Sequence, residues 1–386
     1  MSLPPGATGG PRVGYAWVVS ATADAPTVSE ALDRALSGER ITDEDACTLL
    51  RSRDLVAVGR AANELRNRAV EPGVVTFIVD RNLNYSNICY TDCEFCAFYR
   101  RPGDTREGYV LPRAVIFKKI EETLELGGTA LLMQGGHNPD LGLDWYEDLF
   151  KAIKARYPIH LHALSPSEIQ HIARKARMTP SETLGRLRDA GLDSLPGGGA
   201  EVLVDRVRKI ISPRKTTSGE WLSIMRAAHR LGMSTTATMM WGHVETLEER
   251  VEHLRLIREL QDEMHGFRAF ISWTYQPDNT ALAPQVTWNP TSFDYLLMQA
   301  VTRIYLDNVE HIQSSWVTQG TKIGQVALGF GADDMGSIMI EENVVSAAGT
   351  TYRATTEDFV HYIRNAGFRP RQRDTLYRTV REYAAA

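Results

Sequence analysis

The segment Asn84-Tyr-Ser-Asn-Ile-Cys89-Tyr-Thr-Asp-Cys93-Glu-Phe-Cys96-Ala-Phe-Tyr-Arg100 contains three of the four cysteines in this chain. Their spacing is C-x3-C-x2-C, so the three thiols lie on one short loop. Protein thiolates normally hold all the irons of a [4Fe-4S] cluster. Three thiolates leave one iron without a protein ligand, just as catalytic zinc sites keep one position open. The spacing therefore predicts a catalytic [4Fe-4S] cluster held by Cys89, Cys93 and Cys96.

A structural zinc site is the main alternative for this loop, and a group of incidental buried cysteines is another. Zinc ligands usually come as a C-x2-C pair with a second pair well downstream. Here the nearest downstream histidine is His137, and no second pair follows. The fourth cysteine, Cys47, lies apart in an amphipathic stretch, and we expect it to be a small buried apolar side chain.

The chain around the loop alternates between strand patterns and helical patterns. The strand candidates are residues 74–79, 83–85, 129–133, 159–163, 192–195, 235–239, 269–273, 312–316 and 337–340. The helical patterns that separate most of them are residues 113–126, 145–156, 180–190, 219–231, 247–264 and 293–308. Such alternation implies a parallel sheet, and about eight repeats predict an α/β fold of the (β/α)8 TIM-barrel type. A partial, open barrel is the alternative.

Further segments flank the predicted barrel. We expect residues 1–73 to form an N-terminal tail and helical lead-in, residues 74–345 the barrel, and residues 346–386 a C-terminal helical extension packed on it. Within the lead-in, Thr42-Asp-Glu-Asp45 resembles a helix-capping signal. Residues 1–26 lack the basic start and apolar stretch of a signal peptide, so we interpret them as a poorly ordered lead-in.

Charge and composition exclude several classes of function. The formal net charge is -5, which gives no electrostatic footprint for nucleic acid or a membrane surface. No apolar run reaches the roughly 18 residues that span a bilayer, so we expect a cytoplasmic protein. Walker A, GxGxxG and GxSxG motifs are absent. The most basic stretch, residues 206–215, is expected to be a solvated helix face and loop, with docking of an anionic group as the alternative.

The cysteine loop, with Phe95 just before its last cysteine, resembles the radical S-adenosylmethionine (SAM) superfamily. Residues 84–89 and 95–100 resemble a subgroup that acts in futalosine-route menaquinone synthesis and in deazaflavin synthesis. Within it, the chain is most similar to the cyclic dehypoxanthine futalosine synthases, over roughly residues 40–378. The stretches that carry this resemblance are residues 133–140, 160–166, 196–201, 237–245, 341–346 and 372–377. Trp241 and Ser272 depart from the residues usual at those positions.

The resemblance implies a [4Fe-4S] enzyme whose open iron is filled by the amino and carboxylate groups of SAM. SAM would split into methionine and a 5′-deoxyadenosyl radical, which would take a hydrogen from the ribose part of dehypoxanthine futalosine. The resulting carbon radical would add to the aromatic ring of this substrate and close a spiro ring. The rivals are the sister aminofutalosine synthase, which adds the adenosyl radical to its substrate, and a deazaflavin-forming enzyme. A reducing partner such as a flavodoxin or ferredoxin is expected.

Candidate SAM-binding residues lie in the cysteine loop and in loops after the predicted strands, where TIM-barrel active sites form. By the resemblance, the residues after the strand at 129–133 hold the methionine amino group, a serine and a glutamate meet other parts of SAM, and two aromatic rings pack on adenine. Each has a plain structural alternative: a turn, a helix-end charge or core packing. The full set is Phe95, Phe98, Gln134, Gly135, Gly136, Ser165 and Glu201.

Histidines are the candidate bases for proton transfer, because their ordinary pKa lies close to neutral pH. The candidates are His162, His137 and His243. His160 shares a strand face with His162, because side chains two residues apart point the same way. We expect His160 to be a core side chain with its hydrogen bonds satisfied.

Overall fold

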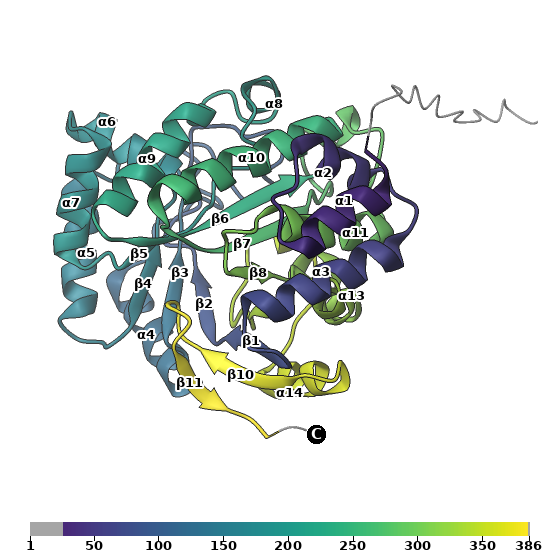
Figure 1. Ribbon diagram of the computed structural model, residues 1–386. Helices are drawn as coiled ribbons and strands as arrows, with labels where there is room; N and C mark the ends of the chain where they lie inside the picture. Colours follow the sequence, from purple (N-terminus) through teal and green to yellow (C-terminus); the bar gives the residue numbers. More distant parts are fainter. Residues whose placement is uncertain (1–25, 385–386) are drawn as a thin grey trace, which may run out of the picture.

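The computed structural model describes residues 26–384 (Figure 1). Three helices precede the sheet: α1 (Val28–Ser37), α2 (Asp43–Leu50) and α3 (Leu55–Ala69). The Thr42 hydroxyl accepts the Asp45 peptide N–H, and the Asp45 carboxylate accepts the Thr42 peptide N–H. The predicted capping signal therefore starts α2, and Cys47 is buried on this helix as expected. The expected lead-in at residues 1–25 lies outside the described residues.

One curled sheet lies at the centre of the molecule (Figure 1). Its strands are β1 (Val74–Ile78), β2 (Asp80–Leu83), β3 (Ala130–Met133), β4 (His160–Ala163), β5 (Ser194–Leu195), β6 (Ser234–Trp241), β7 (Phe267–Thr274), β8 (His311–Gln313), β9 (Asp334–Ser337), β10 (Arg369–Arg373) and β11 (Thr379–Glu382). Their order across the sheet is β11-β10-β1-β9-β8-β7-β6-β5-β4-β3-β2. Neighbouring strands are parallel, apart from the antiparallel pair β10 and β11.

The curl closes because β1 and β2 are two parts of one chain segment. β1 pairs with β9, whereas β2 pairs with β3 at the other end of the strand order. The Ile338 peptide N–H donates to the Ile78 carbonyl at 3.1 Å, and the Ile340 N–H donates to the Asp80 carbonyl at 3.2 Å. The sheet therefore wraps around an interior, and the predicted (β/α)8-type barrel is confirmed.

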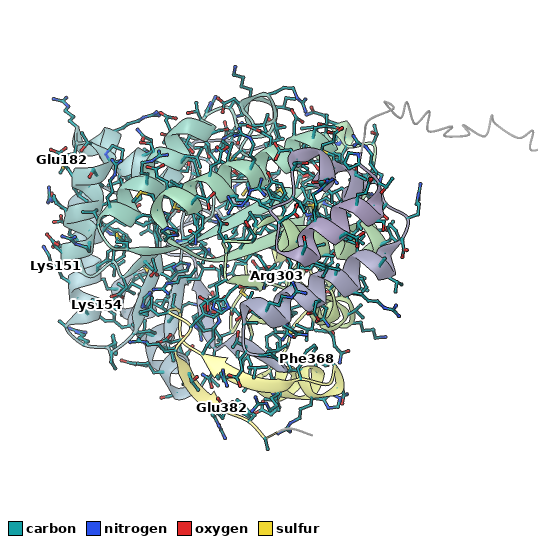
Figure 2. The ribbon with its side chains drawn as sticks, in the orientation of Figure 1. Lys151, Lys154, Glu182, Arg303, Phe368 and Glu382 are labelled. Carbon is teal, nitrogen blue, oxygen red and sulfur yellow. The ribbon has the colours of Figure 1, made fainter. Side chains whose placement is uncertain are left out.

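Helices cover the outside of the curled sheet, and charged side chains such as Lys151 and Glu182 point outward from them (Figure 2). The helices after the lead-in are α4 (Arg113–Glu125), α5 (Leu143–Lys154), α6 (Pro166–Ala176), α7 (Pro180–Ala190), α8 (Asp205–Ile211), α9 (Ser218–Arg230), α10 (Leu247–Met264), α11 (Ser292–Tyr305), α12 (Trp316–Gln319), α13 (Thr321–Val326) and α14 (Thr356–Asn365). Short 3-10 turns are η1 (Ala283–Gln285), η2 (Ala327–Gly329) and η3 (Ser346–Ala348). Within residues 26–384, none of the helices is long and apolar enough to cross a membrane.

Two local predictions were wrong. Ser165, a site candidate expected in a loop after a predicted strand, is instead the N-cap of helix α6, because its hydroxyl accepts the Glu168 peptide N–H and Pro166 occupies the first helical position. The strand expected to reach residue 316 ends at Gln313. Trp316 instead begins α12, where its indole donates to the Ser337 carbonyl at 2.9 Å and packs edge-on against Phe359.

The C-terminal extension is not only helical. After α14 it forms β10, which adds parallel to β1, and β11, which pairs with β10. The sequence of β10 is Arg369-Pro-Arg-Gln-Arg373, so it has no apolar alternation to indicate a strand. Ion pairs supply its contacts instead: Arg371 pairs with Glu71 and Glu382, and Arg373 pairs with Asp334. The extension therefore continues the central sheet at its β1 edge.

Candidate active site

The cysteine loop follows β2, at the carboxyl end of the parallel strands. Cys89 and Cys93 are buried and Cys96 is partly buried. The Thr91 hydroxyl lies 3.0 Å from Cys89 Sγ and 3.4 Å from Cys93 Sγ. The His137 peptide N–H, from the loop after β3, donates to Cys89 Sγ at 3.3 Å. The three thiols are thus gathered in one shielded loop whose sulfurs already have polar neighbours.

The donor atoms on this loop are the three cysteine sulfurs. Thiolates alone are the donor set of [4Fe-4S] clusters, and hydrogen bonds to their sulfurs tune the cluster.

A buried charge cluster lies beside the cysteine loop, and the sequence did not predict it. The Lys215 ammonium is 2.9 Å from Glu201 Oε1 and 5.1 Å from the centre of the Phe95 ring. Arg208 Nη1 lies 3.5 Å from Glu201 Oε2, and both side chains are almost fully buried. Burial raises the pKa of Cys93 to about 12, and the Lys215 charge opposes this rise. The basic stretch is therefore not merely a solvated face, because two of its cations point inward.

The glycines after β3 are required by close packing. A Cβ on Gly135 would lie 2.4 Å from the Tyr85 ring, and a Cβ on Gly136 would lie 3.1 Å from Cys89 Cβ. Their peptide N–H groups point to Glu168 Oε1, at 3.0 Å and 3.3 Å respectively. The expected open approach to a ligand is therefore filled by protein at these two residues, whereas the Gln134 side chain faces the interior cavity.

The barrel contains a partly open cavity of about 300 Å³. Gln134, Gly197 to Gly199 and Glu201 line it near the carboxyl ends of the strands, the end that carries the cysteine loop. Its floor comes from the C-terminal extension, through Arg373, Thr375 and Tyr377. The hydroxyl oxygens of Thr375 and Tyr377 are buried without a hydrogen-bond partner in the described residues. The cysteines are not among the residues that line this cavity, and Glu201 connects it through Lys215 to Phe95 of the cysteine loop.

Of the three candidate bases, only His162 lines this cavity. Burial, with smaller contributions from His160 and Arg373, lowers the pKa of His162 to about 3. The imidazole is therefore neutral near pH 7, which is the form that accepts a proton. Its Nδ1 lies 2.6 Å from the Ser194 hydroxyl, and this contact fixes the ring.

His137 is held outside the cavity by its neighbours. Its Nε2 lies 2.9 Å from the Ser167 hydroxyl, and its ring stacks on His171 with centres 5.1 Å apart. Burial lowers its pKa well below the ordinary value. The side chain therefore supports the wall behind Cys89, and only its peptide N–H reaches a candidate ligand sulfur.

His243 is fully buried in the loop after β6. Its Nε2 lies 3.0 Å from the Met240 carbonyl, and its Nδ1 accepts the Val244 peptide N–H at 2.7 Å. Glu245 Oε2 is 3.0 Å away, but burial outweighs this charge and lowers the pKa of His243. Both ring nitrogens are engaged by the protein, so the geometry does not support His243 as a base.

The remaining candidates lie around the loop without lining the cavity. Phe95 is partly buried below Lys215, and Phe98 is partly buried in the same loop. Ser165 caps α6, and its hydroxyl is 3.8 Å from the position of a Cβ on Gly199. Trp241 and Ser272, the two departures from the family pattern, contact each other at 3.4 Å between Nε1 and Oγ.

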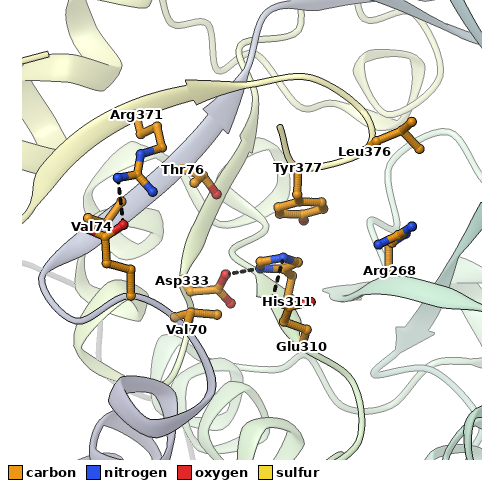
Figure 3. A pocket seen from close by; sticks show the side chains of 11 residues that line it. Val70, Val74, Thr76, Arg268, Glu310, His311, Asp333, Arg371, Leu376 and Tyr377 are labelled. Atoms are coloured by element: carbon orange, nitrogen blue, oxygen red, sulfur yellow. Dashed lines mark hydrogen bonds and ion pairs between the residues drawn. The ribbon is translucent and has the colours of Figure 1, made fainter. Parts of the chain in front are cut away.

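A second pocket, of about 350 Å³, opens at the opposite end of the barrel (Figure 3). Tyr377 stacks there on His311, with ring centres 3.5 Å apart and an interplanar angle of 2°. Asp333 Oδ2 lies 2.7 Å from His311 Nδ1. The pocket contains none of the predicted site residues, and Tyr377 separates it from the interior cavity.

Comparison with known proteins agrees with this geometry. A family model described as the radical SAM superfamily matches residues 83–257, and one described as the CofH/MqnC C-terminal region matches residues 264–385. The chain belongs to the radical SAM superfamily, whose enzymes use a [4Fe-4S] cluster and SAM. The methylornithine synthase structure shares the fold, with a TM-score of 0.68 at 19% identity over 88% of this chain and 97% of that one. The hydrogenase maturase HydG gives 0.70 at 16% identity, over 91% and 76%.

Similar proteins of known name indicate which members of the superfamily this chain resembles. The chain is 48% identical to the cyclic dehypoxanthine futalosine synthase of Streptomyces coelicolor, over 90% of this chain and 87% of that protein. It is 48% identical to the synthase of the same name from Halalkalibacterium halodurans, over 91% and 95%. It is also 40% identical to the 5-amino-6-(D-ribitylamino)uracil–L-tyrosine 4-hydroxyphenyl transferase of Methanococcoides burtonii, over 91% and 99%.

Proposed function

We propose that this protein converts dehypoxanthine futalosine to cyclic dehypoxanthine futalosine in menaquinone synthesis. The assignment of this substrate rests on the 48% identity to two cyclic dehypoxanthine futalosine synthases over at least 90% of the chain. The cavity near the carboxyl ends of the strands, the end that carries the cysteine loop, supports the reaction type. A primary carbon radical attacks most C–H bonds, so its reaction needs a space that excludes water and stray hydrogen donors.

We assign the cluster to Cys89, Cys93 and Cys96, and the polar part of SAM to Gln134 and Glu201. The two polar residues line the cavity on the side of the cysteine loop, which supports this assignment. When bound, the cluster and SAM supply one electron and the 5′-deoxyadenosyl radical that removes a hydrogen atom from the substrate ribose. The protein orients the reacting groups and keeps water out.

Some of the candidate residues do not line the cavity, and we place them around SAM in supporting roles. We propose that Phe95 and Phe98 pack near adenine, and that Ser165 stays close to the SAM site through Gly199. Gly135 and Gly136 act by allowing Tyr85 and Cys89 to approach, since a Cβ on either glycine would meet those side chains. Their role is thus to shape the site and not to donate to the ligand.

His162 is the base that receives the proton lost when the ring closes. It is the candidate histidine that lines the cavity, and burial keeps its imidazole neutral. His137 Nε2 contacts Ser167, and its Nδ1 is buried without a partner in the described residues. His243 has both ring nitrogens in protein contacts, and neither histidine lines the cavity.

We propose that the barrel and the C-terminal extension have different roles. The barrel, residues 74–345, carries the cluster and SAM, and the extension, residues 346–386, supplies the floor through Arg373, Thr375 and Tyr377. We further infer a reducing partner of the flavodoxin or ferredoxin kind in the cytoplasm. The net charge of -5 supports a protein without nucleic-acid or membrane partners.

An anaerobic assay with the reconstituted enzyme tests the proposal. Turnover should release one free 5′-deoxyadenosine per product, and the product should be two hydrogens lighter than the substrate. Deuterium at the ribose C4′ position should pass to 5′-deoxyadenosine. An adenosylated product would instead indicate aminofutalosine synthase activity. Consumption of tyrosine with 5-amino-6-(D-ribitylamino)uracil would indicate the activity named for the archaeal relatives. Either result would overturn the proposal.

A further inference from the structure

Two histidines of β4 are joined through one serine of the neighbouring strand. His162 Nδ1 lies 2.6 Å from Ser194 Oγ, and His160 Nε2 lies 2.7 Å from the same oxygen. The parallel register places Ser194 beside His162, and Ser194 is only 1% exposed. A hydroxyl group can accept a proton from one partner and donate its own to another. The three side chains therefore form a continuous hydrogen-bonded chain.

The inner end of this chain faces the cavity. His162 lines the cavity and is partly buried, whereas Leu161 and Ala163 on the other face of β4 are fully buried. Within residues 26–384, no protein group forms a hydrogen bond with His162 Nε2. If Nδ1 carries the proton and donates it to Ser194, Nε2 presents a lone pair to the cavity. That lone pair can accept a proton from a molecule bound in the cavity.

The outer end leads to a charged rim. His160 is also partly buried, but it does not line the cavity. The charged groups around it are Asp193, Lys154, Asp374 and Arg378, all of which are at least partly exposed. Lys154 lies at the outer edge of the molecule in Figure 2. A proton that reaches His160 is therefore close to solvent.

We propose that His162, Ser194 and His160 form a relay that carries the ring-closure proton from the cavity to solvent. The inference rests on the function proposed above. The C–H bond of the attacked ring carbon breaks, and its proton goes to His162 Nε2. The Nδ1 proton then moves to Ser194, and the Ser194 proton moves to His160 Nε2. The bonding pair restores the aromatic ring, and the surplus electron goes to the oxidised [4Fe-4S] cluster as acceptor.

Burial lowers the pKa of His162 to about 3, so this imidazole passes a proton on and does not keep it. Burial also lowers the pKa of His160; the carboxylates of Asp193 and Asp374 act against this effect, whereas Lys154 and Arg378 add to it. The direction of transfer therefore rests on geometry, because His162 lines the cavity and His160 lies near charged groups that are at least partly exposed. Ser194 and His160 are positioning residues, since neither reaches the substrate.

If the relay operates, breaking it should uncouple hydrogen abstraction from product formation and should not cause a general loss of activity. In Ser194→Ala and His160→Gln, C4′ hydrogen abstraction should continue, but product per 5′-deoxyadenosine should fall about tenfold or more. Ser194→Thr keeps the hydroxyl and should restore the ratio. The matched control is Thr235→Val, which removes a buried hydroxyl 2.7 Å from His229 Nε2, outside the cavity-lining set.

The measurement is the ratio of product to 5′-deoxyadenosine in anaerobic turnover, with iron content and circular dichroism as folding checks. Wild-type ratios in both Ser194→Ala and His160→Gln would overturn the relay. An equal loss of abstraction and product in both would also overturn it, because that result indicates a structural role. If the wild-type enzyme makes no cyclic product at all, the proposed function fails instead.

Discussion

The Lys215 ammonium lies 2.9 Å from Glu201 Oε1 and 5.1 Å from the centre of the Phe95 ring. This one side chain therefore joins the cysteine loop to a carboxylate that lines the cavity. Lys215 comes from the loop after α8, and Glu201 from the loop after β5. The contact couples the proposed cluster site to the proposed SAM site through a buried ion pair.

Replacing Glu201 should affect SAM more than the cluster. In Glu201→Gln we expect the Kd for SAM to rise about tenfold, which corresponds to about 1.4 kcal/mol, with near-normal iron content. Lys215 and Arg208 would lose their carboxylate partner, so the free energy of unfolding should also fall. Calorimetric titration with SAM checks the affinity. Glu249→Gln, in a surface pair with Arg206, is the control and should bind SAM normally.

The cysteine assignment predicts that three of the four thiols are needed for cluster assembly and that the fourth is not. Cys89→Ala, Cys93→Ala and Cys96→Ala should each lose the cluster, because a [4Fe-4S] cluster with three protein ligands has none to spare. Cys47→Ala should keep normal iron and sulfide, since Cys47 is a buried apolar contact on α2. Iron and sulfide are counted after anaerobic reconstitution. Near-normal iron in the Cys93 variant would contradict the assignment.

Gly136 should tolerate no side chain. Its φ is 92°, and an added Cβ would lie 3.1 Å from Cys89 Cβ and 3.3 Å from Cys89 Sγ. Gly136→Ala should therefore lose about 1–3 kcal/mol of stability and most of its iron. Gly142→Ala is the control, because its nearest neighbour would be Lys175 Cε at 3.7 Å. Equal iron in the two variants would show that the close approach to Cys89 is not required.

Acid should destabilise the fold through buried histidines. Burial lowers the pKa of His253 to about 3, and its Nδ1 accepts the Leu203 peptide N–H at 3.0 Å. Because the unfolded chain binds the proton near pH 6.5, stability is lost as the pH falls below that value. Between pH 7 and pH 5 the loss from His253 should be about 2 kcal/mol.

His253→Asn keeps an acceptor for Leu203 but cannot be protonated in this range. Urea unfolding at pH 7 and pH 5 should therefore show a smaller pH dependence for this variant than for the wild type. His361→Asn, on the exposed face of α14, is the control and should behave as the wild type. The same pH dependence in His253→Asn and wild type would exclude His253 as a source of acid sensitivity.

The parts predicted from sequence are those encoded by local patterns. Three cysteines on one loop lie close whatever the rest of the chain does, so Cys89, Cys93 and Cys96 could be grouped without a structure. Strand and helix periods likewise repeat locally, and the barrel follows from their alternation. The C-terminal strands were missed because β10 is held by arginine ion pairs, and such pairs leave no apolar period in the sequence.

The parts missed depend on contacts between distant segments. Lys215 appeared only as one residue of a basic stretch, and nothing local indicates that it folds inward to Glu201. Ser194 had no motif of its own, and its role follows from the register of β4 and β5. Similarly, His162 faces the cavity because of the side-chain alternation of β4, whereas the direction of His243 depends on how the loop after β6 folds. Residue type alone could not separate these two candidates.

The pairing of β1 with both β9 and β10 has a consequence for synthesis of the chain. Glu71, just before β1, and its partner Arg371 are 300 residues apart. At roughly 5–20 residues per second, the unpaired backbone edges of β1 emerge from the ribosome many seconds before the strands that pair with them. Uncovered strand edges of this kind pair readily with other chains. The edges of β1 therefore stay unpaired until β9 and β10, near the end of the chain, have been made.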